Sequence, residues 1–168
     1  MVFQSLPTER HEVQILTTDF QYSGQLETVG PVLNYINDTG RDSLTLYDAH
    51  LTPLTPGSPL KGLSRPMVVI RRPQIVFLYF TKAETRAAIK TLTRNEPLVA
   101  YTPVAVCKAQ FHLAGETRIR DFVDAMQESL LPVSEVRLFP IIELSAPFPT
   151  KVDLLLVGRS QIHAYHTT

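Results

Sequence analysis

The stretch VVIRRPQIVFLYF, residues 68–80, places Arg71, Arg72, Pro73 and Gln74 between two strongly apolar runs. The runs are rich in β-branched and aromatic residues, which favour strands, whereas proline with polar neighbours favours a tight turn. A residue in such a turn needs no sheet hydrogen bond from its N–H group and faces solvent. We therefore expect two strands joined by a short turn whose arginine side chains point into water.

A similar stretch, LLLVGRSQIHAYH, lies near the end of the sequence at residues 154–166. Aligning the two pairs Arg72 with Arg159 and Gln74 with Gln161, at an offset of 87 residues. The same offset aligns SLTLYDAHLTPL (43–54) with LLPVSEVRLFPI (130–141), and VLNYIND (32–38) with IRDFVDA (119–125). These matches predict an internal duplication. The alternative is that two halves of any β-rich chain place strands at similar intervals.

Nearer the start of the sequence, the best offset between the copies becomes 91 residues. It pairs Val13 with Val104, Phe20 with Phe111 and Gly24 with Gly115. The first copy would then carry four extra residues near 27–31, where a loop absorbs additional length at little cost.

Each copy is expected to contain the same series of short elements. In the first copy, VQILTTDFQYSGQL (13–26) predicts a hairpin that turns near Thr18–Asp19, with Gly24 at a bend or bulge. The other elements expected in this copy are a short helical turn at 32–38, a strand at 44–51, a loop at 52–66 and strands at 67–71 and 75–80.

The segment between the copies, TKAETRAAIKTLTRNEP at 81–97, predicts a connecting helix. Thr81 followed by Glu84 matches a capping box, and Pro97 would end the helix. Ala87, Ala88 and Leu92 are the side chains expected to dock it against the sheet.

Composition limits the classes of protein to which this sequence can belong. The 168 residues include sixteen basic and sixteen acidic side chains, so the chain lacks the broad basic field of most nucleic-acid binders. Thirteen prolines disfavour an all-helical fold, and the single cysteine excludes an internal disulfide. No signal-peptide pattern opens the sequence, and no apolar run reaches the roughly 20 residues that span a bilayer. We expect a soluble, cytoplasmic protein that does not bind membranes.

Several motifs resemble those of the Sm-like family. In its first motif a hairpin is followed by G-x-L, as at Gly24 and Leu26, and the motif closes on a strand similar to SLTLYDA (43–49). IRRPQI (70–75) resembles the second motif, I-R-G-x-x-I/V. The matching positions of the second copy are Gly115, Leu131, Val157, Arg159 and Ile162. The same order of elements also resembles some bacterial families of unknown function.

The resemblance implies a mainly β protein with two tandem small Sm-like or SH3-like β-barrels. Residues 1–80 would form the first, residues 98–168 the second, and the helix at 81–97 would join them. Gly24, Gly115 and Asp48 would be structural residues. Sm-like barrels join through their edge strands, so the chain is expected to be a homo-oligomer, with a ring as one arrangement, and an assembly or interaction module.

Binding of single-stranded RNA is the alternative function that the resemblance implies. The site that this function would use consists of the polar turn residues of both copies, Arg71, Arg72, Gln74, Arg159 and Gln161. Arginine offers forked donors that suit phosphate. Ser43 and Leu130 stand where Sm proteins place an asparagine that contacts RNA. The competing interpretation is that these turns are solvated and carry no ligand.

No residue pattern in the sequence indicates an enzyme, a cofactor or a metal site. His163 and His166 would face opposite sides of a strand, and Cys107 lies in an apolar alternation that predicts burial. Asp48 and Glu135 occupy matching positions, where a carboxylate bonded to backbone amides is the usual explanation. Phe77, Tyr79 and Tyr165 are expected in or on the sheet rather than as stacking platforms for bases.

Overall fold

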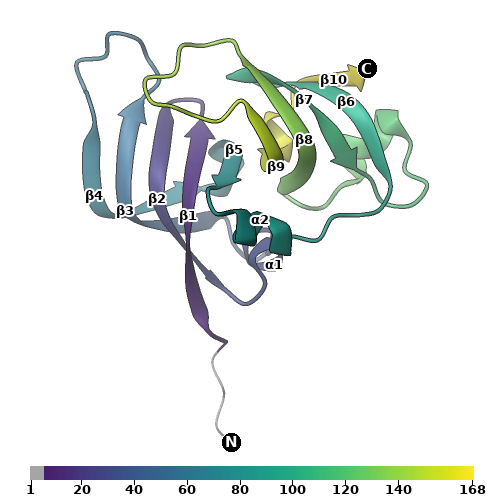
Figure 1. The fold of residues 1–168 in the computed structure, drawn as a ribbon, viewed down its shortest axis with the longest axis horizontal. Coiled ribbons are helices and arrows are strands. Elements are labelled where there is room, and N and C mark those ends of the chain that lie inside the picture. Colours follow the sequence, from purple (N-terminus) through teal and green to yellow (C-terminus); the bar gives the residue numbers. More distant parts are fainter. Residues whose placement is uncertain (1–5) are drawn as a thin grey trace, which may run out of the picture.

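The computed structural model describes residues 6–168 and contains one open, ten-stranded antiparallel sheet (Figure 1). The strands are β1 (Thr8–Thr17), β2 (Phe20–Val29), β3 (Ser43–Pro53), β4 (Leu63–Arg71), β5 (Ile75–Phe80), β6 (Asn95–Tyr101), β7 (Ala105–His112), β8 (Leu130–Pro140), β9 (Lys151–Gly158) and β10 (Ala164–Thr167). The helices are short: α1 (Val32–Ile36), α2 (Ala83–Ala88), α3 (Phe122–Ala125) and the 3-10 turns η1 (Arg72–Gln74), η2 (Ile119–Asp121) and η3 (Arg159–Gln161). The prediction of a mainly β protein is confirmed.

The two halves of the sheet repeat one strand order. The full order is β10-β6-β7-β8-β9-β5-β1-β2-β3-β4, so each half runs from its fifth strand through its first to its fourth. The halves lie side by side and meet where β9 pairs with β5 (Figure 1). Strands β4 and β10 form the two outer edges. The sheet is not closed, so two separate barrels are not what the structure shows.

The first hairpins of the two halves turn through the same hydrogen bonds. Thr17 Oγ1 donates to the Phe20 carbonyl at 3.1 Å, and Thr102 Oγ1 donates to the Ala105 carbonyl at 2.7 Å. The hairpins are therefore equivalent at an offset of 85 residues, and the predicted offset of 91 is wrong. Matching glycines at 24 and 115 suggested that larger offset.

The bulge that bends β2 has its counterpart at an alanine. Registers shift between Ser23 and Gln25 in the first half and between Lys108 and Gln110 in the second. Gly24 thus corresponds to Ala109, and Gly115 lies in the loop after β7. A Cβ on Gly24 would come within 2.7 Å of the Tyr47 carbonyl oxygen, which explains why glycine occupies the first of these bulges.

Downstream of the hairpins, equivalent main-chain hydrogen bonds of the two halves lie 87 residues apart, as predicted. The Arg72 N–H donates to the Asp42 carbonyl at 2.7 Å, and the Arg159 N–H donates to the Ser129 carbonyl at 2.8 Å. Asp48 and Glu135 are the residues other than glycine with positive φ among residues 6–168, at 49° and 52°. The chain therefore makes the same left-handed step at the same place in β3 and β8.

The connecting segment is less helical than the sequence predicted. α2 spans Ala83–Ala88, and Pro97 lies inside β6. No side chain caps α2, because the Thr81 hydroxyl donates to the Glu12 carbonyl instead. Ala87, Ala88 and Leu92 are exposed, so they do not dock the segment as expected. Arg86 holds it to the sheet by donating to the carbonyls of Phe80 and Thr81.

Two apolar cores form, one in each half, and each includes side chains from the other half. The first-half core contains Leu130 and Leu156 of the second half. The second-half core contains Leu16, Val76 and Phe77 of the first half, together with Leu54. Because each core is completed from across the boundary, the halves depend on one another for burial.

Candidate interaction edges and arginine turns

The internal junction joins the fifth strand of one half to the fourth strand of the other. Phe77 pairs with Val157 and Leu78 pairs with Leu156 across β5 and β9. All four side chains are fully buried. Sheet hydrogen bonding and apolar burial therefore act together at this strand pair.

A glycine permits the close approach of the strands at one end of the junction. A Cβ added to Gly158 would lie far inside van der Waals distance of the Ile75 carbonyl oxygen. Any larger residue at position 158 would push the end of β9 away from β5.

A side chain of the first half extends the junction beyond the paired strands. The amide of Asn37 donates to the Leu130 carbonyl at 3.0 Å and accepts from the Leu130 N–H at 2.8 Å. This two-way bond ties the turn after α1 to the start of β8. No sequence pattern indicated this bond, because only the fold brings residues 37 and 130 together.

The loop from β8 to β9 also covers part of the first half (Figure 1). The Gln21 side chain donates to the carbonyls of Ala146 and Pro147 at 3.2 and 3.1 Å. Ser145 Oγ donates to the Pro53 carbonyl at 3.0 Å. This loop was expected only as a connection between strands, and its sequence carries no signal for the contact.

Within residues 6–168, the two outer edges have no strand beside them. On β4, Met67 and Val69 are each 53% exposed although both are large and apolar. On β10, Ala164, His166 and Thr167 are exposed. Edge strands of this kind present unpaired N–H and C=O groups that can take up another strand.

The two arginine turns converge, as a shared site would require. Ser160 Oγ and Gln161 Nε2 both donate to the Pro73 carbonyl, at 3.1 and 2.8 Å. η1 and η3 thus touch across the junction. Gln74, the counterpart of Gln161, is exposed.

Two of the three predicted arginines are used inside the protein. Arg72 is 6% exposed and donates from Nη1 to the carbonyls of Ile36 and Asp38 at 3.0 and 2.7 Å, so the expectation that it points into water is wrong. Arg159 donates from Nε and Nη1 to main-chain carbonyls of residues 128 and 123, at 3.0 and 3.3 Å. Arg71 does point outward, with 66% of its side chain exposed and Asp42 at 3.7 Å.

The other candidate residues from the sequence have structural surroundings. Cys107 is fully buried, and burial raises the pKa of its thiol to about 12, which disfavours the nucleophilic thiolate. His166 lies 3.0 Å from the Tyr101 hydroxyl, and the Tyr165 hydroxyl donates to the Ile119 carbonyl at 2.7 Å. Within residues 6–168, no three metal-binding side chains form a cluster that could hold an ion.

No family model, curated protein or solved structure matches this chain. In the part of the chain that the structure describes, no helix has the length and apolar character needed to cross a membrane.

Proposed function

We propose that this chain is a non-enzymatic assembly module that joins other polypeptide chains by extending its sheet at β4 and β10. The observation that supports the proposal is the junction between β5 and β9, where strand pairing buries four large side chains completely. The same strand positions recur at the outer edges, where they remain open. Strand addition to such an edge is a common mode of polypeptide recognition.

The positions of the arginine side chains also favour assembly over binding of single-stranded RNA. Arg72 and Arg159 donate to main-chain carbonyls, and the formal net charge of the chain is zero. A phosphate backbone draws affinity from several free cationic side chains.

Sedimentation of the wild-type chain at micromolar concentration, with and without a uridine-rich oligonucleotide at low and moderate salt, tests the proposal. We expect assemblies heavier than one chain whose sedimentation is unaffected by the oligonucleotide. Val69→Lys should weaken this association, because a lysine on an edge strand opposes pairing. Leu92→Lys is the control, since Leu92 is 46% exposed and lies outside the edge strands. A monomer throughout would contradict the proposal, and a monomer that binds the oligonucleotide in a salt-sensitive way would favour RNA binding.

A further inference from the structure

We infer that the partner at the outer edges is a second copy of this chain, joined head to tail so that β4 of one copy pairs with β10 of the next. This inference rests on the proposed function and specifies its partner. In this arrangement β4 would meet β10 as β9 meets β5 inside the chain. The internal junction therefore serves as the template for the contact between chains.

The β4 edge carries the apolar residues that such a contact requires. At the offset of 87 residues, Met67 corresponds to Leu154 and Val69 to Leu156. Leu156 pairs with Leu78 at the internal junction and is 0% exposed, and Leu154, two residues before it on β9, is 8% exposed, whereas Met67 and Val69 are both 53% exposed. The β4 edge thus presents apolar side chains where the same positions of β9 are covered.

The β10 end carries the complementary surface. Tyr101 corresponds to Leu16 in the hairpins, and Ile141 corresponds to Leu54. The Leu54 N–H donates to the Asp19 carbonyl as the Ile141 N–H donates to the Val104 carbonyl, which fixes the second equivalence. Leu16 and Leu54 are 2% and 4% exposed, but Tyr101 and Ile141 are 41% and 60% exposed.

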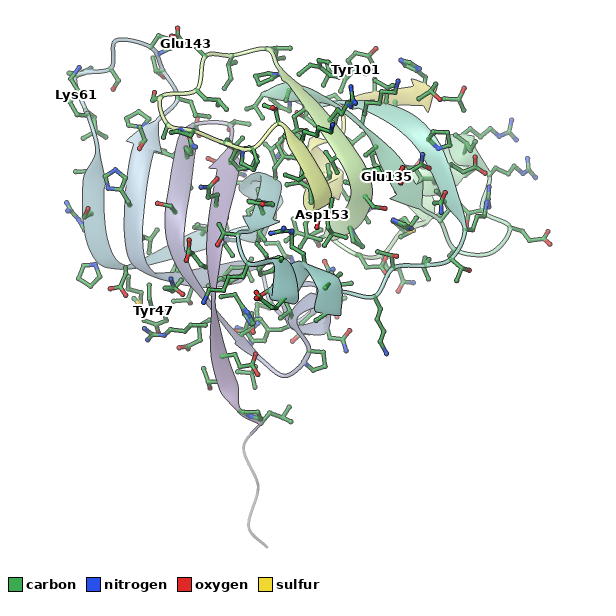
Figure 2. The ribbon with its side chains drawn as sticks, viewed as in Figure 1. Tyr47, Lys61, Tyr101, Glu135, Glu143 and Asp153 are labelled. Carbon is green, nitrogen blue, oxygen red and sulfur yellow. The ribbon has the colours of Figure 1, made fainter. Side chains whose placement is uncertain are left out.

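The β3–β4 loop, residues 54–62, can cover this surface on a second copy. It corresponds to the β8–β9 loop, because β3 and β8, like β4 and β9, keep the offset of 87. Ser58 occupies the position of Ser145, whose hydroxyl holds the β8–β9 loop on the first half. Lys61 lies at the left end of the molecule and Tyr101 well to its right, in the other half (Figure 2), so the loop of one chain lies away from Tyr101 of that chain.

The exposed apolar residues are concentrated at these two ends. Eight large apolar side chains are exposed among the described residues, and Met67, Val69, Tyr101 and Ile141 are four of them. All four have buried counterparts in the other half of the chain. The two ends differ from each other, so each copy would offer one end to each neighbour and build a ring or a filament.

One difference from the internal junction changes the geometry of the contact. Arg71 stands where β9 has Gly158, whose missing Cβ allows close approach to Ile75. The contact between chains must therefore open at the Arg71 end of β4 while Val69 and Met67 remain covered. Arg71→Gly should restore the close approach and strengthen assembly by about tenfold.

Two variants, each blocking a different end, test the head-to-tail arrangement. Val69→Asp blocks the β4 end and Ile141→Asp blocks the β10 end, and each should weaken assembly roughly 10- to 100-fold, since burial of an aliphatic side chain is lost. Each variant alone should be monomeric at a concentration where the wild-type chain assembles. An equimolar mixture should form a dimer and nothing larger, because only one intact pair of ends remains.

Leu92→Asp is the matched control, because it places the same charge at an exposed leucine outside both ends. Far-ultraviolet circular dichroism should show that all variants retain the fold. Wild-type-like assembly of both variants would overturn the inference together with the proposed use of these two edges. A mixture that stays monomeric while the wild-type chain assembles and each variant alone does not would overturn the head-to-tail arrangement and leave the proposed function standing. A wild-type chain that is itself monomeric would overturn the proposed function.

Discussion

Strands β9 and β4 are the same element in two settings, one inside the sheet and one at its edge. β9 lies between the halves and carries Leu156 and Gly158, both buried. β4 carries the exposed Val69 and Arg71 at these positions. A glycine and large aliphatic residues therefore stabilise the internal junction, whereas β4 keeps only the apolar part of that pattern.

The largest effect on stability is expected from adding a side chain at Gly158. Gly158→Ala forces a Cβ against the Ile75 carbonyl and should lower the free energy of unfolding by about 3 kcal/mol or more. Arg71→Ala, at the equivalent exposed position, should change it by less than about 0.5 kcal/mol. Urea denaturation of both variants measures the difference, and equal losses would show that β9 is not specially constrained.

Truncation of the next pair of equivalent residues separates folding from assembly. Leu156→Ala removes a fully buried side chain from the first-half core and should cost about 3 kcal/mol. Val69→Ala should leave the stability of the single chain within about 0.5 kcal/mol of wild type. Thermal unfolding at low protein concentration provides the measurement. A large loss from Val69→Ala under those conditions would mean that β4 is already buried in the single chain.

A third comparison is between Arg72 and Arg159, whose side chains both donate hydrogen bonds to main-chain carbonyls. Arg72 is 6% exposed, so Arg72→Ala leaves the carbonyls of Ile36 and Asp38 unpaired and should cost about 3 kcal/mol. Arg159 is only partly buried and makes longer bonds, so Arg159→Ala should cost about 1 kcal/mol. Chemical denaturation distinguishes the two values. If both variants were as stable as wild type, the arginines would be free for a ligand.

Replacing Asp48 or Glu135, the two residues with positive φ, by glycine should have the smallest effect on the free energy of unfolding. This effect should be an increase rather than a decrease. Glu135→Gly relieves the strain of a positive φ and should stabilise the fold by about 0.5 kcal/mol, after the added flexibility of glycine in the unfolded chain is subtracted. Asp48→Gly should gain less, because aspartate tolerates this conformation better than glutamate. Melting temperatures measured side by side would show this order, and destabilisation by either change would indicate a role for the lost carboxylate.

Much of the fold could be read from the sequence because its signals are local. The turn at Arg72–Gln74, the hairpin turn at Thr18–Asp19 and the helical turn after residue 31 all lie where proline, polar residues or alternation place them. The offset of 87 residues also follows from local similarity. These features depend on neighbouring residues, and sequence patterns report neighbours.

The misses came from contacts between distant residues. Burial of Arg72 depends on the carbonyls of residues 36 and 38, which no pattern places beside it. The predicted offset of the first hairpins was wrong because it matched Gly24 to another glycine, Gly115. The strand registers show that Gly24 corresponds to Ala109. The predicted helix at 81–97 was too long, because α2 ends at Ala88 and β6 already begins at Asn95.

The central claim, that the outer edges are open versions of the internal junction, is tested most directly by hydrogen exchange at two protein concentrations. The amides of β5 and β9 should be protected at both concentrations, because their pairing lies within one chain. We predict that amides of β4 and β10 gain protection as the concentration rises, and that Val69→Asp abolishes the gain on both strands, because no intact β4 edge remains to pair with β10. Exchange from β4 and β10 that does not depend on concentration would contradict the account.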